Sequence, residues 1–127
     1  MKRFKVAHVI TRLCKGGAQE NTFHTVRLAD RERFDVHLIS GPTVGDEGSI
    51  EPDVEAAGIQ ILREPDLTRN VSPWRDFLAL NSLKRRFALE GYDIVHTHTS
   101  KAGVLGRIAA RKAGVPIVVH TPHGNIF

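Results

Sequence analysis

The sequence has few cysteine and aromatic residues and no long apolar run. Cys14 is the only cysteine among 127 residues, so no intrachain disulfide or thiolate metal cage can form, and a reducing compartment is expected. Aromatic residues make up 6% of the chain, and no basic segment alternates with stacking rings, which argues against nucleic-acid binding. No apolar run approaches the ~20 residues that span a bilayer, and residues 1–4 lead directly into a predicted strand. We therefore expect a cytoplasmic protein.

The hydrophobic and charged content of the chain is typical of one globular domain. Hydrophobic residues account for 41% and charged residues for 25% of the chain, and this length is enough to bury a core. The net charge of +4 indicates an anionic partner, either a phosphate-bearing substrate or a membrane surface. The alternative is a solvated basic surface, because the basic clusters at 84–86 and 107–112 fall on predicted helices.

Strand and helix patterns alternate along the chain. Strands are predicted at 4–11, 34–40, 59–62, 93–97 and 117–119, with helices at 18–29, 52–57, 73–90 and 100–113. This alternation predicts an α/β fold, a Rossmann-like doubly wound parallel sheet in a three-layer α/β/α arrangement. The simplest strand order is 3-2-1-4-5, and residues 1–127 form one domain. In the predicted helices at 18–29 and 73–90, we expect the apolar side chains to face the core, including Leu28, Trp74, Phe77 and Leu89.

Polar residues follow the last two predicted strands. Parallel strands end at one edge of a sheet, and open α/β sheets bind ligands at that edge. The order 3-2-1-4-5 changes direction between the first and fourth strands, so a crevice is predicted there. The crevice would hold the Gly16–Gly17 loop on one side, His98 and Ser100 on the other, and His123 beside them. The polar residues predicted along the whole edge are His96, His98, Thr99, Ser100, Thr121, His123 and Gly124.

The glycine pair at Gly16 and Gly17 lies between a predicted strand and a predicted helix. Glycines let the backbone approach a ligand closely, and the free amides of a helix start attract anions. The pair is a candidate phosphate cradle. A plain tight turn is the alternative, because the spacing matches neither the dinucleotide-binding fingerprint nor a Walker A loop.

Histidines are frequent near the predicted edge, so a metal site has to be weighed. His96 and His98 share one face of their strand, but His120 and His123 straddle a bend, and no carboxylate is nearby in sequence. We therefore predict no metal. His8, inside the first strand, is expected to be a packed core histidine.

Two other enzyme classes fit poorly. Ser100 opens a helix without a nucleophile-elbow sequence, which disfavours a serine hydrolase. A nicotinamide-dependent dehydrogenase would need a glycine fingerprint and an acidic residue at the end of the second strand, where Ser40 and Gly41 stand.

Two long segments carry a family resemblance. VAHVITRLCKGGAQENTFHTVRLA at 6–29 and DIVHTHTSKAGVLGRIAARKAGVPIVVHTPHG at 93–124 resemble the amino-terminal half of retaining GT-B-fold glycosyltransferases. The resemblance is to the large bacterial nucleotide-sugar-dependent group, glycosyltransferase family 4-like. It implies an enzyme of hexosyltransferase type that moves a sugar from a nucleotide-sugar donor to a lipid, polysaccharide or small-molecule acceptor. It also implies that no cofactor or metal is needed.

The resemblance assigns roles to residues of the predicted edge. Gly16 and Gly17 would present backbone amides to the donor diphosphate, and His123 would be the catalytic histidine beside the transferred sugar. The acceptor side of the cleft would be lined by His98, Thr99, Ser100 and Lys101.

The chain departs from this family in length. Members are several-fold longer, and their second domain supplies basic residues for the diphosphate and an acidic E-x7-E segment for the sugar. We therefore expect the chain to be a truncated acceptor-side domain that is inactive without a carboxyl-terminal domain, in cis or in trans. Cytoplasmic location with peripheral contact at the inner face of the membrane is expected. The alternative is a stand-alone Rossmann-like binding or protein-interaction module.

Overall fold

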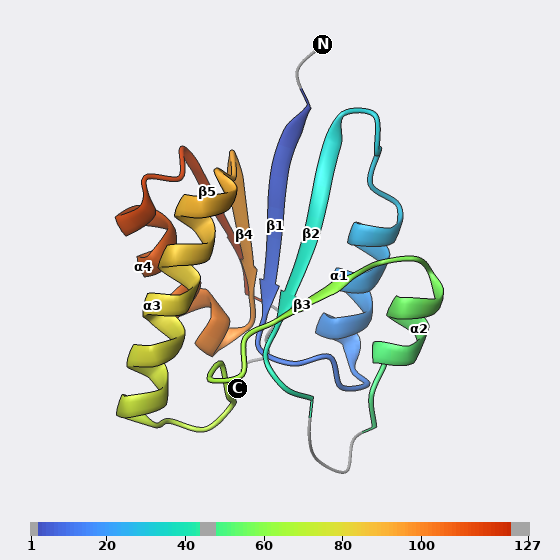
Figure 1. Cartoon of the computed structure of the whole chain (residues 1–127). Coiled ribbons are helices and arrows are strands. Elements are labelled where there is room, and N and C mark those ends of the chain that lie inside the picture. Colours follow the sequence, from blue (N-terminus) through green and yellow to red (C-terminus); the bar gives the residue numbers. More distant parts are fainter. Residues whose placement is uncertain (1–2, 44–47, 123–127) are drawn as a thin grey trace.

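The computed structural model describes residues 3–43 and 48–122, in which strands and helices alternate (Figure 1). The strands are β1 (Phe4–Ile10), β2 (Phe34–Ser40), β3 (Ile61–Arg63), β4 (Ile94–His98) and β5 (Ile117–Thr121). The helices are α1 (Gly17–Arg27), α2 (Glu51–Ala56), α3 (Pro73–Glu90) and α4 (Ser100–Ala113).

All described strand pairs are parallel, in the order β3-β2-β1-β4-β5, which confirms the predicted topology. The central strand β1 pairs with β2 on one side and with β4 on the other. The chain therefore reverses its direction across the sheet between β1 and β4, and the loops after these strands diverge to opposite faces.

Two helical layers cover the two faces of the sheet (Figure 1). Alternate residues of β1 point to opposite faces, so Val6 and Ile10 join the core beneath α1 and α2. Ala7 and Val9 join the other core, beneath α3 and α4. The structure is thus the predicted three-layer, Rossmann-like α/β domain.

Helix α4 approaches the sheet closely because it carries glycine where it crosses β4 and β5. A Cβ atom added at Gly106 would lie 2.6 Å from Thr97 Cγ2, and one added at Gly103 would lie 2.5 Å from His120 Cε1. These contacts leave no room for a side chain. The position of the α4 start relative to the sheet is therefore fixed by close packing.

The end of the fourth strand was predicted one residue too early. His98 lies within β4 with His96, and not after it, because the ladder with β5 continues through His98 opposite Thr121. The helix predicted at 100–113 is confirmed: Ser100 is the first residue of α4, and Thr99 occupies the cap position.

The predicted core faces of α1 and α3 were also partly wrong. Leu28 is 70% exposed, Trp74 69%, Phe77 56% and Leu89 79%. Leu28 is the C-cap residue of α1 and lies outside the helix. In α3, Ala79, Leu83 and Phe87 supply the buried stripe, and one stripe covers only part of a helix circumference.

Candidate functional site

The loops after β1 and β4 are joined at the carboxyl edge of the sheet. The hydroxyl oxygens of Thr11 and Thr99 lie 3.1 Å apart, and Thr11 Oγ1 also accepts a hydrogen bond of 3.1 Å from the Ala102 amide. Thr11 follows β1 directly and is buried, whereas Thr99 and Ala102 belong to the start of α4. At the predicted crevice, hydrogen bonds therefore join the loop after β1 to the start of α4.

The glycine pair lies at the start of α1, on this same edge. Gly16 occupies the cap position, Gly17 is the first helical residue, and the cap makes no side-chain hydrogen bond within the described part of the chain. A Cβ atom at Gly17 would meet nothing within 4 Å, and Gly17 is exposed. The first turn of α1 is thus accessible to a ligand, which is what a phosphate cradle requires.

The loop that carries the glycine pair is also hydrogen-bonded to residues 48–50. Lys15 donates its backbone amide to the Gly48 carbonyl at 3.2 Å, and the Ile50 amide donates to the Leu13 carbonyl at 2.9 Å. Cys14 is buried in this loop and forms an isolated bridge with Ser49. The loop is therefore fixed by backbone hydrogen bonds on both sides of Cys14.

Thr99 has a backbone conformation that is unusual for a β-branched residue. Its φ is 69° and its ψ 174°, and it is the one non-glycine residue with positive φ in the ranges 3–43 and 48–122. Such conformations cost on the order of 1–3 kcal/mol and concentrate at functional sites. Hydrogen bonds of the Thr99 hydroxyl to Thr11 and to the His98 carbonyl hold this conformation. Ser100, the next residue, is exposed and begins α4.

Lys101 joins the start of α4 to the start of α3. Its Nζ lies 2.6 Å from Asp76 Oδ1 and also donates to the Asn70 carbonyl. The Lys101 side chain is 12% exposed. The ammonium group is therefore engaged within the chain, and its predicted contact with an acceptor stays a prediction.

A cluster of three histidines lies on the face of the sheet that α1 and α2 cover. His8 Nδ1 lies 2.9 Å from His98 Nε2, and the rings of His96 and His98 stack at a centroid distance of 4.3 Å. His96 Nε2 lies 2.6 Å from Thr121 Oγ1. Burial, and then the neighbouring charge of His96, lower the pKa of His8 to about 4. His8 is therefore neutral at pH 7.

The cluster differs from the histidine group that the sequence suggested. His120 projects to the other face of the sheet, where its Nδ1 lies 2.8 Å from Thr97 Oγ1, because successive residues of β5 alternate. His8, and not His120, contacts His98 in the cluster. No sequence signal indicated this contact, since 90 residues separate His8 from His98. His123 and Gly124 lie outside the described residues.

The three histidines of this cluster could offer nitrogen ligands to a metal, since one nitrogen of each lies within 4.8 Å of the others. The rings, however, stack with interplanar angles of 19° to 35°. The in-plane lone pairs of stacked rings run side by side, whereas a tetrahedral site needs them to converge on the ion. The geometry favours a hydrogen-bonded imidazole cluster over a metal centre.

His98 is only 3% exposed and lies beneath Thr99. In this structure, an acceptor at the edge would meet Thr99 and Ser100 first, and His98 would act on it through them. The direct contact of His98 with an acceptor stays a prediction.

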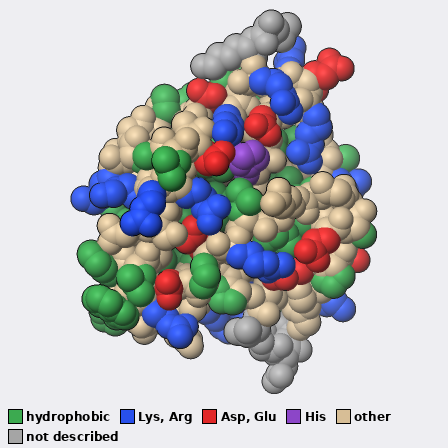
Figure 2. All heavy atoms as spheres, viewed as in Figure 1, with side chains coloured by type: hydrophobic (Ala, Val, Ile, Leu, Met, Phe, Trp, Pro, Cys, Tyr) green, Lys and Arg blue, Asp and Glu red, His purple; other side chains and the backbone are tan. Residues whose placement is uncertain are grey.

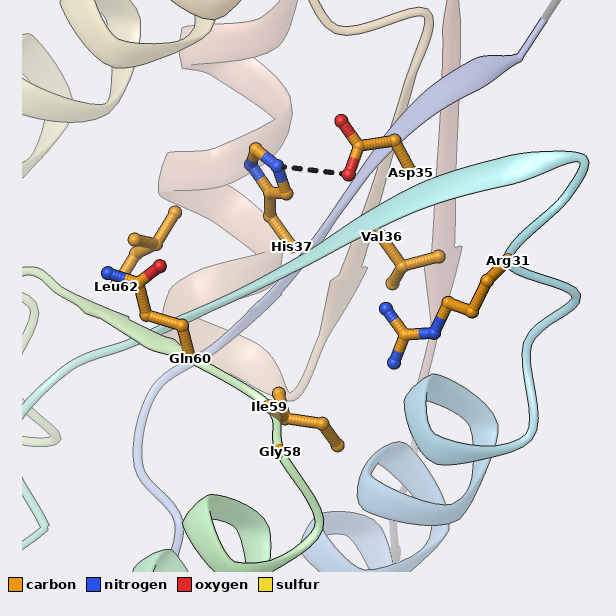
Figure 3. A pocket seen from close by; sticks show the side chains of 8 residues that line it. All are labelled: Arg31, Asp35, Val36, His37, Gly58, Ile59, Gln60 and Leu62. Atoms are coloured by element: carbon orange, nitrogen blue, oxygen red, sulfur yellow. Dashed lines mark ion pairs between the residues drawn. The ribbon is translucent and has the colours of Figure 1, made fainter.

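A hollow of about 250 Å³ lies elsewhere, at the amino ends of β2 and β3 (Figure 3). Asp35 and His37 line it with a separation of 3.4 Å between His37 Nε2 and Asp35 Oδ1, and Arg31, Ile59 and Gln60 complete its wall. It occupies the edge of the sheet opposite to the Thr11 and Thr99 loops. Ligands of parallel sheets bind at the carboxyl edge, so this hollow is not part of the candidate site.

Across the residues that the structure describes, no helix combines the length and apolarity needed to cross a bilayer.

Comparison with known proteins shows the family to which this chain belongs. The glycosyl transferase 4-like domain matches residues 16–127. The chain is 42% identical over 128 aligned residues to the UDP-Gal:alpha-D-GlcNAc-diphosphoundecaprenol alpha-1,3-galactosyltransferase of Escherichia coli, covering 98% of this chain and 31% of the enzyme. It is 33% identical over 94 residues to the capsular polysaccharide biosynthesis glycosyltransferase CapH of Staphylococcus aureus, covering 74% of this chain and 23% of that protein.

The fold is shared with a solved glycosyltransferase from Rickettsia africae, with a TM-score of 0.75 and 19% identity over 99% of this chain and 31% of that one. This likeness concerns the fold alone. The chain thus spans about a third or less of the length of the relatives it matches. The sequence match extends over most of the chain, including both loops of the candidate site, and the chain therefore belongs to the glycosyl transferase 4-like domain family.

Proposed function

We propose that the chain is the acceptor-side domain of a retaining glycosyltransferase that moves a sugar from a nucleotide-sugar donor to a lipid-linked acceptor. The observation that carries the proposal is the 42% identity, over 98% of the chain, to an enzyme named for its UDP-galactose donor and its diphosphoundecaprenol-linked acceptor. A lipid diphosphate would then be the acceptor class, and a hexose the transferred group.

The donor side of the proposed site is the first turn of α1. Gly17 has open space around it, so its backbone can approach a diphosphate without side-chain obstruction. Gly16 is half-buried, and a Cβ built there would lie 2.8 Å from Gln19 Oε1, so the Gln19 side chain would have to move for a ligand to reach Gly16. Negative charge develops on the leaving diphosphate during transfer, and amides at a helix start stabilise such charge.

The acceptor side is the start of α4. Ser100 is exposed there, and the positive end of the helix dipole favours an anionic group such as an acceptor diphosphate. Thr99 and Lys101 flank Ser100, and His98 lies beneath them. Because Thr11 links this turn to the loop that precedes α1, donor and acceptor would meet across one rigid edge.

Three parts of the proposal rest on the family resemblance. His123 would stand beside the reacting sugar carbon, transfer would need no metal or cofactor, and a carboxyl-terminal nucleotide-binding domain would complete the cleft in cis or in trans. By itself, the chain would have only half of the cleft and negligible activity. A lipid-linked acceptor places the enzyme at the inner face of the membrane as a peripheral protein.

A chimera tests the proposal. The chain replaces the corresponding amino-terminal segment of the E. coli galactosyltransferase, to which it is 42% identical, and transfer from UDP-galactose to GlcNAc-diphosphoundecaprenol is measured. We expect transfer by the chimera and none by the chain alone. A folded chimera that binds UDP but transfers to no polyprenyl-diphosphate acceptor would contradict the proposal and favour a binding module.

A further inference from the structure

A buried histidine interrupts the apolar side of the central strand. On the face of β1 that α1 and α2 cover, Val6 and Ile10 belong to the apolar core, and His8 stands between them. His8 is only 6% exposed. Burying an imidazole is costly unless its nitrogens are hydrogen-bonded, and an aliphatic side chain would fill this place without that cost. The contacts of the His8 nitrogens therefore decide what the residue does.

The Nδ1 atom of His8 contacts the ring beneath the start of α4. It lies 2.9 Å from Nε2 of His98, and both side chains are buried. A hydrogen bond at this distance needs one proton between the two nitrogens, which a pair of neutral imidazoles provides. His96 packs against both rings, at centroid distances of 5.0 Å and 4.3 Å, and its own Nε2 contacts Thr121. The His8–His98 bond is thus enclosed by a ring that is itself held in place.

A series of hydrogen bonds makes a second link between the end of β1 and the start of α4. The Ala102 amide donates to Thr11 Oγ1, and the Thr99 hydroxyl donates to the His98 carbonyl. Each hydroxyl carries one proton, so Thr11 is the donor in its 3.1 Å contact with Thr99. Every donor in this series therefore has an acceptor.

The two links attach neighbouring residues of one turn to one segment. We call His98, Thr99 and Ser100 the Thr99 turn. His8 contacts His98, and Thr11, three residues further along, contacts Thr99. A single hydrogen bond allows rotation about its axis, whereas two bonds at separate points fix an orientation. The turn needs such fixation, because a φ of 69° is unfavourable for a β-branched residue.

We propose that His8 is a positioning residue for glycosyl transfer, and that its hydrogen bond to His98 holds the Thr99 turn in the orientation in which Ser100 meets the acceptor. The proposal rests on the proposed function, which assigns this turn to the acceptor. His8 is buried and would act through His98 without touching either substrate. Its removal should affect the acceptor side alone, because the glycine loop of the donor side has its own backbone hydrogen bonds to residues 48–50.

Two substitutions of His8 separate the hydrogen bond from the filling of space. His8→Leu keeps a side chain of similar size but removes the bond. His8→Asn places an amide near the position of Nδ1, where it can donate to or accept from His98 Nε2. Leucine suits a buried position far better than asparagine does. A defect that leucine causes and asparagine relieves would therefore reflect the hydrogen bond and not the packing.

His37 provides a matched control on the neighbouring strand. Its Nδ1 lies 2.6 Å from the Tyr92 hydroxyl, so His37→Leu also removes a side-chain hydrogen bond. Figure 3 shows His37 near Asp35, at the edge of the sheet opposite to the Thr99 turn. Figure 2 shows a histidine side chain at the surface, among acidic and basic side chains. His37→Leu should therefore leave the Thr99 turn unchanged.

Amide hydrogen exchange of the full chain tests the positioning without a substrate. The reporters are the Ala102 and Gly103 amides, which donate to Thr11 Oγ1 and to the Thr99 carbonyl. Relative to β2 amides of the same variant, their exchange should be about tenfold faster in His8→Leu, as expected for one lost hydrogen bond, and within about threefold of wild type in His8→Asn and His37→Leu. Unchanged exchange in His8→Leu, or equal acceleration in His8→Asn, would overturn the proposal.

Steady-state kinetics of the chimera test the consequence for transfer. His8→Leu should raise the KM for the polyprenyl-diphosphate acceptor about tenfold and leave the KM for UDP-galactose unchanged, and His8→Asn should restore most of the loss. A general structural defect would raise both KM values, and that result, or an unchanged acceptor KM, would overturn the proposal. An inactive wild-type chimera would contradict the proposed function instead, and the exchange of the Ala102 and Gly103 amides would still decide whether His8 holds the turn.

Discussion

The hydroxyl of Thr11 lies 3.1 Å from the hydroxyl of Thr99, although 88 residues separate the two in the chain. The same Thr11 oxygen receives the Ala102 amide. The contact connects the loop after the central strand with the start of α4, at the point where the sheet order reverses. The two loops of the candidate site are thereby held at a fixed separation.

Replacing Thr11 with valine should therefore destabilise the domain. The variant keeps the shape of the side chain but leaves the buried Ala102 amide without its acceptor, which costs about 1–3 kcal/mol. Urea unfolding measures the loss. Thr25→Val is the control, because it removes a hydroxyl that bonds the Asn21 carbonyl on an exposed helix surface. Similar losses in both variants would mean that the Thr11 contact is unimportant.

Two glycine substitutions should have opposite effects. Gly106→Ala would place a Cβ 2.6 Å from Thr97 Cγ2, so α4 must shift away from β4 at a cost of about 1–3 kcal/mol. Gly17→Ala meets nothing within 4 Å and should be neutral or stabilising by up to about 1 kcal/mol. Thermal unfolding of both variants checks this. A stable Gly106→Ala variant would show that α4 is not packed as described.

Gly17 also allows a test of the phosphate cradle. In the chimera, Gly17→Val should weaken donor affinity, because a branched side chain would cover the amides of the first turn of α1. Stability should change little, since the space there is open. Titration with UDP-galactose measures the affinity. An unchanged dissociation constant would show that the glycine pair is only a turn.

Stability should fall as the pH is lowered from about 6.5 to about 4. The pKa of His8 is about 4 in the folded protein and about 6.5 in an unfolded chain, so protons bind preferentially to the unfolded state. The stability linked to neutral His8 is fully present above pH 6.5 and is lost as the pH falls toward 4, and it amounts to roughly 3 kcal/mol. Urea unfolding across this range, compared with His8→Gln, isolates the histidine from the carboxylates. Equal pH dependence in both proteins would contradict the assignment.

The role of Lys101 can be separated from that of its ion pair. Asp76→Asn weakens the ion pair with Lys101 but leaves the ammonium available, whereas Lys101→Met removes both. If Lys101 contacts the acceptor, Lys101→Met should raise the acceptor KM of the chimera about tenfold or more, the loss expected for a charge-assisted hydrogen bond, and Asp76→Asn should raise it much less. Equal effects would make Lys101 a positioning residue.

The topology could be predicted from the sequence because the strand patterns, the helix ends and the order of the elements all indicated the same fold. β-Branched strands alternate with helices closed by Gly91 and Gly114, both in the left-handed conformation, and such an alternation allows few sheet orders. The candidate edge followed from the same reasoning, since the loops that carry Gly16 and Thr99 both begin where a parallel strand ends.

What sequence patterns could not provide were contacts between distant side chains. The His8–His98 contact depends on the register between β1 and β4, which no local signal specifies. The left-handed backbone of Thr99 contradicts the preference of β-branched residues, so it is imposed by tertiary hydrogen bonds. Trp74 and Phe77 were expected in the core from their periodicity, but α3 buries a narrower stripe than its apolar content suggests.

We propose that this chain supplies the acceptor side and the catalytic histidine of a glycosyltransferase. Galactosyl transfer to GlcNAc-diphosphoundecaprenol tests this most directly when the chimera is compared with its His123→Ala variant and with a His24→Ala control at an exposed position of α1. We predict transfer by the chimera and the control, and a loss of about a hundredfold or more in the His123→Ala variant. Undiminished transfer without the His123 imidazole, or none by a folded chimera, would contradict the account.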